Sequence, residues 1–517
     1  MNKLISEIDR LKYPNQLWVV LIVGAMMLAA FGTSIFSFGY SIDGYLMCAA
    51  PSDYWSGFAK SNIANGRFGR ALIYAVLHFF AVDDCFSPTL YGVLSISINL
   101  ASLLLVLRMW NLSSILGGAM IGGLFLVHPY HAEMYSFREG GVYFSGSLFL
   151  ALLAVKMLTE SDSVKFRKIY AIALLVSSLS IYQLSINYAL IALVFSICER
   201  VINDPNIENG IHDWRRTFKD VVSMFTVALA SIVVYVVVNK IVLATSGQVA
   251  LERTHLMAVT AIPRRLAELP STFHWILFSN QEILPASEKK ILFLIPLIAL
   301  LSVVFFYVKK KGELVQPFFI FGIVALTLLT CLLLVLGIQL PLQALTRESR
   351  TISAISLFLA GSLMIVIKTQ PMFFRRWLAK GLPILFVIFA GNANHALTDQ
   401  LRVNARDQAK ANRIFSALEG HPAYSTLNKL VVIGGSWNYS ATIYTAEGDL
   451  NASAFSAAWA RTALIEEVSG HRFEWVQPDE YASAQNFCDS APKWPDRNSY
   501  SIRNGLGVVC LGDGVNP

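Results

Sequence analysis

Charged residues are scarce in this chain. Of its 517 residues, 15% are Asp, Glu, Lys or Arg, whereas 55% are hydrophobic, and an ordinary soluble domain has about 25% charged residues. This balance argues against a soluble globular protein and predicts an α-helical polytopic membrane protein. The formal net charge of +7 does not indicate nucleic-acid binding, because the basic residues gather in the loops between apolar segments.

Several motifs that would indicate a nucleotide, a hydrolase or a metal are absent. The sequence has no Walker A loop, no GxGxxG after a predicted strand, no HExxH and no GxSxG, which argues against ATP-driven transport, dinucleotide chemistry and a standard serine hydrolase. No CxxC or Cys/His spacing indicates zinc. No DxD triplet in the predicted outer loops indicates a metal-held nucleotide sugar. We therefore expect no cofactor: paired acids could hold a divalent ion, but nothing indicates one.

About eleven apolar windows suit membrane spans, although several are short. The first window is too long for a signal-peptide core and lacks a small-residue cleavage site, so we expect it to be retained as an anchor. The windows lie at residues 17–38, 89–109, 112–128, 141–158, 168–183, 186–200, 220–243, 291–308, 315–337, 351–368 and 380–397.

Basic clusters in alternate loops predict the orientation. Clusters such as Lys3/Arg10/Lys12 and Lys309/Lys310/Lys311 would face the cytoplasm by the positive-inside rule. Eleven spans then put the N-terminus in the cytoplasm and the C-terminus outside. The apolar segment 71–82 is too short to cross, so we expect it to lie along the interface or to re-enter. The predicted outer loops are 41–88, 129–140, the short turn at Tyr182/Gln183, 244–290 and 338–350.

Hydropathy falls sharply after about His395. The remaining chain is polar, with helix-like stretches and the strand-like runs KLVVIGG and GVVCLG, which predict a small α/β domain on the outer face. We therefore divide the chain into a transmembrane catalytic domain, 1–397, and a soluble periplasmic domain, 398–517. Cys488 and Cys510 in the second domain could form a disulfide in an oxidising compartment.

Ionisable side chains gather in the predicted outer loops. Such groups are costly at a membrane edge and are functional candidates by default. A carboxylate there can accept a proton from an attacking hydroxyl, and a guanidinium can bind a phosphate leaving group. These groups suit transfer of a sugar from a polyprenyl-phosphate carrier to an acceptor on the outer face. The candidates are Asp43, Asp53, Arg67, Arg70, His131, Glu133, Arg138 and Arg347.

Each candidate also has a structural interpretation. Asp43 could cap a juxtamembrane helix, and Arg67 and Arg70 could extend their charges toward water from the interface. Tyr54 and Trp55 could stack on sugar rings, although aromatic residues are commonly found at membrane interfaces for other reasons. The functional interpretation therefore rests on several charged groups lying on one face.

Seven segments of the chain carry a resemblance to a known family. They are SIDGYL, NGRFGRAL, HPYHAEMYSFREGG, SIYQLS, TRESR, CDSAPKWPDRNSYSI and VVCL. Taken together, they are similar to the phage-type serotype-converting O-antigen glucosyltransferases, multispan enzymes of the GT-C class, over nearly the whole chain. The resemblance implies a GT-C-like fold in the bacterial inner membrane, and transfer of glucose from undecaprenyl phosphate to the O-antigen of lipopolysaccharide on the periplasmic face.

The resemblance also implies roles for individual residues. The GT-C class has its usual candidate base in the first outer loop, which here is Asp43, with Asp53 as second choice. The class often has two acids close together there, whereas these two are ten residues apart. The donor phosphate would be held by Arg67, Arg70, Arg138 and Arg347, and the acceptor side would be lined by His131, Glu133, Tyr54 and Trp55.

Two other functions stay open at this point. A flippase or transporter for polyprenyl-linked glycans would need charges near the middle of its spans and broken helices in related halves, and the span centres here are nearly free of charge. An O-antigen polymerase or ligase is chemically close to a glucosyltransferase. The partners that we expect are the lipid bilayer, a flippase and a donor-synthesising enzyme, and no nucleic acid.

Overall fold

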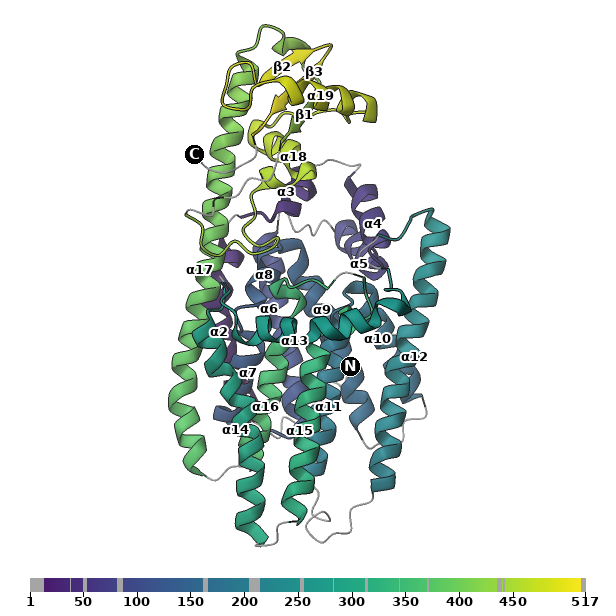
Figure 1. Ribbon diagram of the computed structural model, residues 1–517, viewed down its shortest axis with the longest axis vertical. Coiled ribbons are helices and arrows are strands. Elements are labelled where there is room, and N and C mark those ends of the chain that lie inside the picture. The colour runs from purple at the N-terminus through teal and green to yellow at the C-terminus, as the bar shows by residue number, and fades with distance from the viewer. Residues whose placement is uncertain are drawn as a thin grey trace.

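The computed structural model describes residues 14–37, 39–49, 54–80, 87–160, 166–203, 214–251, 255–281, 283–311, 315–343, 345–369, 372–434, 439 and 442–512. Long helices run side by side in one bundle, and a small group of strands and helices lies beyond one end of it (Figure 1). We call this end of the bundle the sheet end. Among the described residues, eight helices are long and apolar enough to cross a membrane. The chain therefore has the architecture of a polytopic helical membrane protein.

Each of the eleven predicted windows coincides with a helix. The eight long helices are α2 (Pro14–Phe36), α6 (Pro88–Met109), α9 (Arg138–Thr159), α11 (Ser185–Asn203), α12 (Trp214–Ser246), α14 (Ala286–Lys311), α15 (Val315–Leu336) and α17 (Met372–Glu419). The three shorter ones are α7 (Ile115–Leu126), α10 (Arg167–Ile181) and α16 (Ile355–Thr369). At 1.5 Å per residue the shorter helices extend roughly 18 to 22 Å, less than the hydrocarbon thickness of about 30 Å. The number of crossings therefore stays a prediction.

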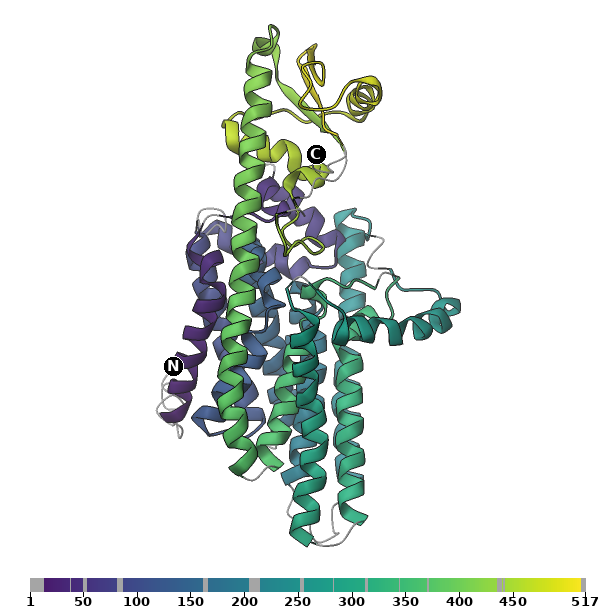
Figure 2. The same ribbon diagram turned by 60° about the vertical axis from the view of Figure 1, so that its left-hand side comes forward.

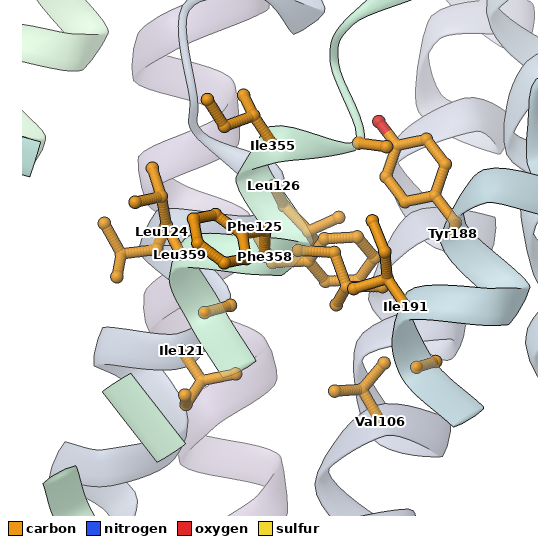
Figure 3. Close-up of a cluster of buried hydrophobic side chains, with 14 of the residues drawn as sticks. Val106, Ile121, Leu124, Phe125, Leu126, Tyr188, Ile191, Ile355, Phe358 and Leu359 are labelled. Carbon is orange, nitrogen blue, oxygen red and sulfur yellow. The ribbon is translucent and has the colours of Figure 1, made fainter. Parts of the chain in front are cut away.

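The core of the bundle forms where α16 packs against α7 and α11. Figure 3 shows Phe358 and Leu359 of α16 beside Phe125 of α7, with Tyr188 and Ile191 of α11 next to them. Almost every residue of α16 is buried, so this helix is covered on all sides by other helices. Its apolar character therefore reflects burial in protein as well as any contact with lipid.

Five helices gather at the sheet end of the bundle. They are α3 (Ile42–Ala49), α4 (Tyr54–Ala64), α5 (Phe68–Phe79), α8 (His131–Ser136) and α13 (Ile262–Phe278). Helix α5 covers most of the segment that we expected not to cross, and its 12 residues are too few to span a bilayer. Helix α13 lies across the bundle axis and projects sideways from it (Figures 1 and 2).

The C-terminal region contains a three-stranded sheet in the order β1-β3-β2. Strand β1 (Lys429–Ile433) is parallel to β3 (Leu506–Cys510), and β2 (Tyr500–Arg503) is antiparallel to it. Because side chains alternate along a strand, β1 contributes to two cores. Leu430 and Val432 pack toward α18 (Ala458–Ser469), whereas Val431 and Ile433 pack toward α19 (Pro478–Ser490).

One long helix connects this sheet to the bundle, and a disulfide bond stabilises the C-terminal region internally. Helix α17 has 48 residues and runs from the bundle to the sheet without interruption (Figure 2), through residues 397 and 398 where we placed the domain boundary. That division stays a prediction. Cys488 of α19 and Cys510 of β3 form a disulfide bond, which links a helix to the central strand.

Candidate functional site

A fully buried carboxylate, Glu133, lies on α8 at the sheet end of the bundle. Its Oε2 accepts a hydrogen bond of 2.7 Å from the backbone N–H of Arg350, and its Oε1 lies 3.4 Å from a guanidinium nitrogen of the same residue. Burial raises the pKa of Glu133 to about 8, although Arg350 opposes the rise. The side chain is therefore a buried acid that can change its protonation near neutral pH.

Arg350 joins three carboxylates from distant parts of the chain. Besides Glu133, its guanidinium lies 2.7 Å from Glu348 and 2.5 Å from Asp449, and it stands 4.8 Å from the ring centre of Phe137. Burial alone would lower the pKa of Arg350, but these acids raise it above its usual value. We call Glu133, Glu348, Arg350 and Asp449 the Arg350 cluster. Its cation is already surrounded by acids, so it has little capacity left for a phosphate.

The loop that carries Arg350 is held by Gln339. The Gln339 amide donates to the carbonyl of Thr351 at 2.9 Å, and its oxygen accepts from the backbone and the hydroxyl of Thr346 at 3.1 Å each. A single amide therefore closes the loop over residues 346–351 and places Arg350 toward α8. This is how the sequence TRESR is positioned beside Glu133.

A second arginine, Arg67, lies over the ring of Tyr182, with its guanidinium carbon 4.9 Å from the ring centre. Burial raises the pKa of the Tyr182 phenol, and the charges of Arg67 and Arg350 oppose the rise, so both arginines lie close enough to act on this tyrosine. Gln183 next to it donates to the carbonyl of Asn65 at 2.8 Å and to the Tyr235 hydroxyl at 2.9 Å. The turn at Tyr182/Gln183 is thus part of the site as well as a chain reversal.

Two of the three remaining predicted arginines, Arg70 and Arg347, have aromatic partners. Arg70 of α5 is buried, with its guanidinium 4.8 Å from the ring centre of Tyr143 and 5.2 Å from that of Phe58. Arg347 is exposed, and its guanidinium stands 5.7 Å from the ring centre of Trp275 on α13. Arg138 begins α9, and its side chain lies outside the part of the chain that the structure describes.

Asp43 lies in the first turn of α3, where that helix packs against α18. Its Oδ1 accepts a hydrogen bond of 3.1 Å from the indole N–H of Trp459. The carboxylate is half-buried, and Trp459 is 53% exposed. A carboxylate and an exposed indole therefore lie together at the junction of α3 and the C-terminal region.

The other predicted site residues either hold helices together or lie outside the part of the chain that the structure describes. His131 is buried, and its Nε2 is 2.9 Å from the carbonyl of Phe125 and 3.2 Å from the Ser356 hydroxyl. Burial lowers the pKa of His131 to about 4, so it is neutral and ties α8 to α7 and α16. Asp53 lies outside the described residues, as do the side chains of Tyr54 and Trp55 in α4.

No group of three or more His, Cys, Asp or Glu side chains that could hold a metal ion occurs among the described residues. The site consists instead of buried acids, arginines and aromatic rings at one end of a helical bundle. Such groups can accept a proton and stabilise an anion, which are the two requirements of glycosyl transfer from a phosphate.

A match to a known family covers most of the chain. Residues 32–367 match the family described as Glucosyl transferase GtrII. The chain belongs to the GtrII glucosyltransferase family. This confirms the resemblance to the serotype-converting glucosyltransferases, and the matched residues include Asp43, Arg67, Glu133 and Arg350. No curated protein and no solved structure matches the chain.

Some residues of this candidate site are among those that the sequence predicts, and their roles stay predictions. The sequence pointed to Glu133 and Arg67 because charges at a membrane edge are unusual. The sequence did not connect Asp449 with the loop that carries Arg350, and it placed Lys289 and Trp275 in the predicted outer loop 244–290 without giving them a role. Asp449 is 99 residues from Arg350, and no spacing rule connects charged residues so far apart. Arg350 and Tyr182 lie in TRESR and SIYQLS, two of the segments that carry the family resemblance. That resemblance was the feature of the sequence that could have pointed to these two residues.

Proposed function

We propose that this GtrII family member transfers glucose from a polyprenyl phosphate, undecaprenyl phosphate in a bacterial inner membrane, to the O-antigen of lipopolysaccharide on the periplasmic face. Family membership supports the glucosyltransferase activity. The observation that carries the proposal is the meeting of Glu133, Arg350, Arg67 and Tyr182 at one end of a membrane bundle. A membrane-bound donor needs its reactive group at such an end.

The C-terminal region supports the periplasmic assignment of the sheet end. Its disulfide between Cys488 and Cys510 is of a kind that persists in oxidising compartments such as the periplasm. The two free cysteines among the described residues, Cys198 and Cys331, are buried within α11 and α15. The sheet, the disulfide and the Arg350 cluster would then all face the periplasm.

In the proposed reaction, an acceptor hydroxyl attacks C1 of the glucosyl group. A new C1–O bond forms, the bond from C1 to the phosphate oxygen breaks, and the polyprenyl phosphate leaves with the bonding electron pair. Asp43 takes the proton of the attacking hydroxyl as general base. This carboxylate is half-buried and has the exposed Trp459 indole beside it, so a sugar can approach it.

Glu133 has a different proposed role, because it is completely buried. An acceptor sugar cannot reach its carboxylate without a rearrangement of α8 or of the loop that carries Arg350. We assign Glu133 as a positioning residue that holds Arg350, and with it the loop at 345–351, against α8. The acceptor-lining role that the sequence suggested for Glu133 is thereby replaced in our proposal.

The test is a transfer assay with the full-length protein in nanodiscs, using undecaprenyl-phosphate glucose and O-antigen lipopolysaccharide. Asp43→Asn keeps the size and the hydrogen-bond acceptor to Trp459, and we expect at least a 100-fold loss of glucose incorporation with unchanged thermal stability. Asp489→Asn is the control, because Asp489 is exposed on α19. Full activity of the Asp43 variant would remove that residue from the mechanism. Failure of wild-type protein with every polyprenyl-linked glucose would overturn the proposed donor.

A further inference from the structure

A buried lysine, Lys289, shares an aromatic ring with Arg347 near the sheet end of α14. The Lys289 ammonium stands 5.3 Å from the ring centre of Trp275 and donates to that residue's carbonyl at 3.2 Å. Arg347 approaches the same ring at 5.7 Å. Lys289 is 3% exposed. A buried ammonium is costly unless an anion compensates it.

The described part of the chain does not provide that anion at close range. Among the described residues, no carboxylate lies within 4.0 Å of the Lys289 ammonium or the Arg347 guanidinium. Glu447 is the acid whose charge acts on Lys289, from beyond that distance. Arg350, three residues from Arg347, differs because three carboxylates surround it.

A narrow cavity opens beside Lys289, between α13, α14 and α16. It is apolar apart from Lys289, Tyr130 and His128, and its lining also includes Ile276, Leu277, Leu284, Leu292, Phe293, Pro296, Ile355, Phe358 and Leu359. Most of these side chains are buried, whereas Leu277 and Phe293 are half-buried. Entry of an apolar chain between α13 and α14 would require Leu277 and Phe293, which line the cavity, to move aside.

His128 lines this cavity and carries a buried hydrogen-bond donor. The imidazole is completely buried, and its Nδ1 accepts from the backbone N–H of Tyr130 at 3.3 Å. An imidazole nitrogen that accepts a hydrogen bond carries no proton, so the proton is on Nε2. Nε2 has no hydrogen-bond partner among the described residues. A buried donor without a partner is costly, and an anionic oxygen within reach of Nε2 would satisfy it.

We propose that Lys289 and His128 bind the phosphate of an isoprenoid monophosphate, with Arg347 at the mouth of the cavity and the first isoprene units lying among the apolar residues of α13, α14 and α16. One slim chain suits a narrow apolar cavity, whereas the two acyl chains of a phospholipid do not. The assignment rests on the proposed function for the identity of the carrier. It moves the phosphate away from Arg67 and Arg70, whose guanidinium groups lie on Tyr182 and Tyr143.

The binding of sugar-free undecaprenyl phosphate to nanodisc-embedded protein tests this site without requiring transfer. We expect Lys289→Met to weaken binding at least tenfold and His128→Phe to weaken it severalfold. Lys290→Met is the matched control, because Lys290 is the exposed neighbour on the same helix, and we expect its affinity within twofold of wild type. Unliganded melting temperatures of all variants show whether each one is folded.

Competition separates the possible sources of the phosphate. Undecaprenol, inorganic phosphate and phosphatidylglycerol should each fail to displace undecaprenyl phosphate at equal concentration. Displacement by phosphatidylglycerol would show a general lipid site and overturn the assignment, as would equal binding by the Lys289 and Lys290 variants. Wild-type protein that binds the carrier through Lys289 but transfers no glucose would refute the proposed function and leave this site standing.

Discussion

Glu133 is a carboxyl group in a place where a negative charge is costly. Burial raises its pKa to about 8 from a reference of 4.5, so between these values the folded protein binds more protons than the unfolded chain. Its contribution to stability is therefore fully present below pH 4.5 and is lost as the pH rises through 8. This sign is opposite to that of an ordinary surface acid with a lowered pKa.

Glu133→Gln should remove this pH dependence. Each pKa unit corresponds to about 1.4 kcal/mol, so we expect the stability of wild type relative to the variant to fall by a few kcal/mol between pH 5 and pH 8.5. Thermal unfolding in detergent at the two pH values measures the difference. If the stability difference between wild type and variant were the same at both pH values, the raised pKa of Glu133 would be contradicted. Glu160→Gln, a substitution at a half-exposed end of α9, is the control for buffer effects.

At the scale of elements, the turn between α4 and α5 depends on one glycine. Gly66 has a φ of +73°, and a Cβ added to it would lie 2.5 Å from the Tyr235 hydroxyl. That hydroxyl donates to the Gly66 carbonyl at 2.9 Å and accepts from Gln183. These contacts hold the turn that places Arg67 beside Tyr182, and they leave no room for a side chain at residue 66.

Gly66→Ala should reduce both stability and glucose transfer. Gly247 is the matched control, because it also has a positive φ, +67°, but an added Cβ there meets nothing within 4 Å. We expect Gly247→Ala to cost about 1 kcal/mol, the price of the left-handed backbone alone. Gly66→Ala should cost more and lower transfer at least tenfold, measured by thermal unfolding and by the nanodisc assay. Equal effects of the two substitutions would show that the Tyr235 contact is unimportant.

The same scale shows what the sequence could and could not predict. Apolar runs located every helix of the bundle, because burial and lipid contact both require apolar residues. They could not separate a buried helix such as α16 from one with exposed apolar residues such as α12. The domain boundary that they indicate falls within α17 and stays a prediction. Charges in the predicted outer loops pointed to Glu133 and Arg67, whereas Lys289 was not singled out among the charges of the loop predicted at 244–290. Its importance depends on Trp275 and His128, which tertiary packing brings together.

At the scale of the whole molecule, the C-terminal region is joined to the bundle at several places, and three of them bear on the candidate site. Helix α17 connects the two covalently, Asp449 pairs with Arg350, and Trp459 donates to Asp43. The last two contacts connect the C-terminal region directly to the proposed base and to the Arg350 cluster. A glycan bound at the C-terminal region would thus lie next to the groups proposed to act on it.

Trp459→Phe tests whether this connection matters for transfer. The substitution keeps an aromatic face and removes the indole N–H that holds Asp43 at 3.1 Å, so we expect a kcat about tenfold lower with little change in KM for the acceptor, in line with the loss of one orienting hydrogen bond. Trp475→Phe is the control, because Trp475 is 79% exposed elsewhere in the same region. A change in KM alone would mean that Trp459 serves as an acceptor-binding surface. Unchanged kinetics would mean that α3 positions Asp43 without help from the C-terminal region, and the coupling between the two parts would then rest on Asp449 and Arg350.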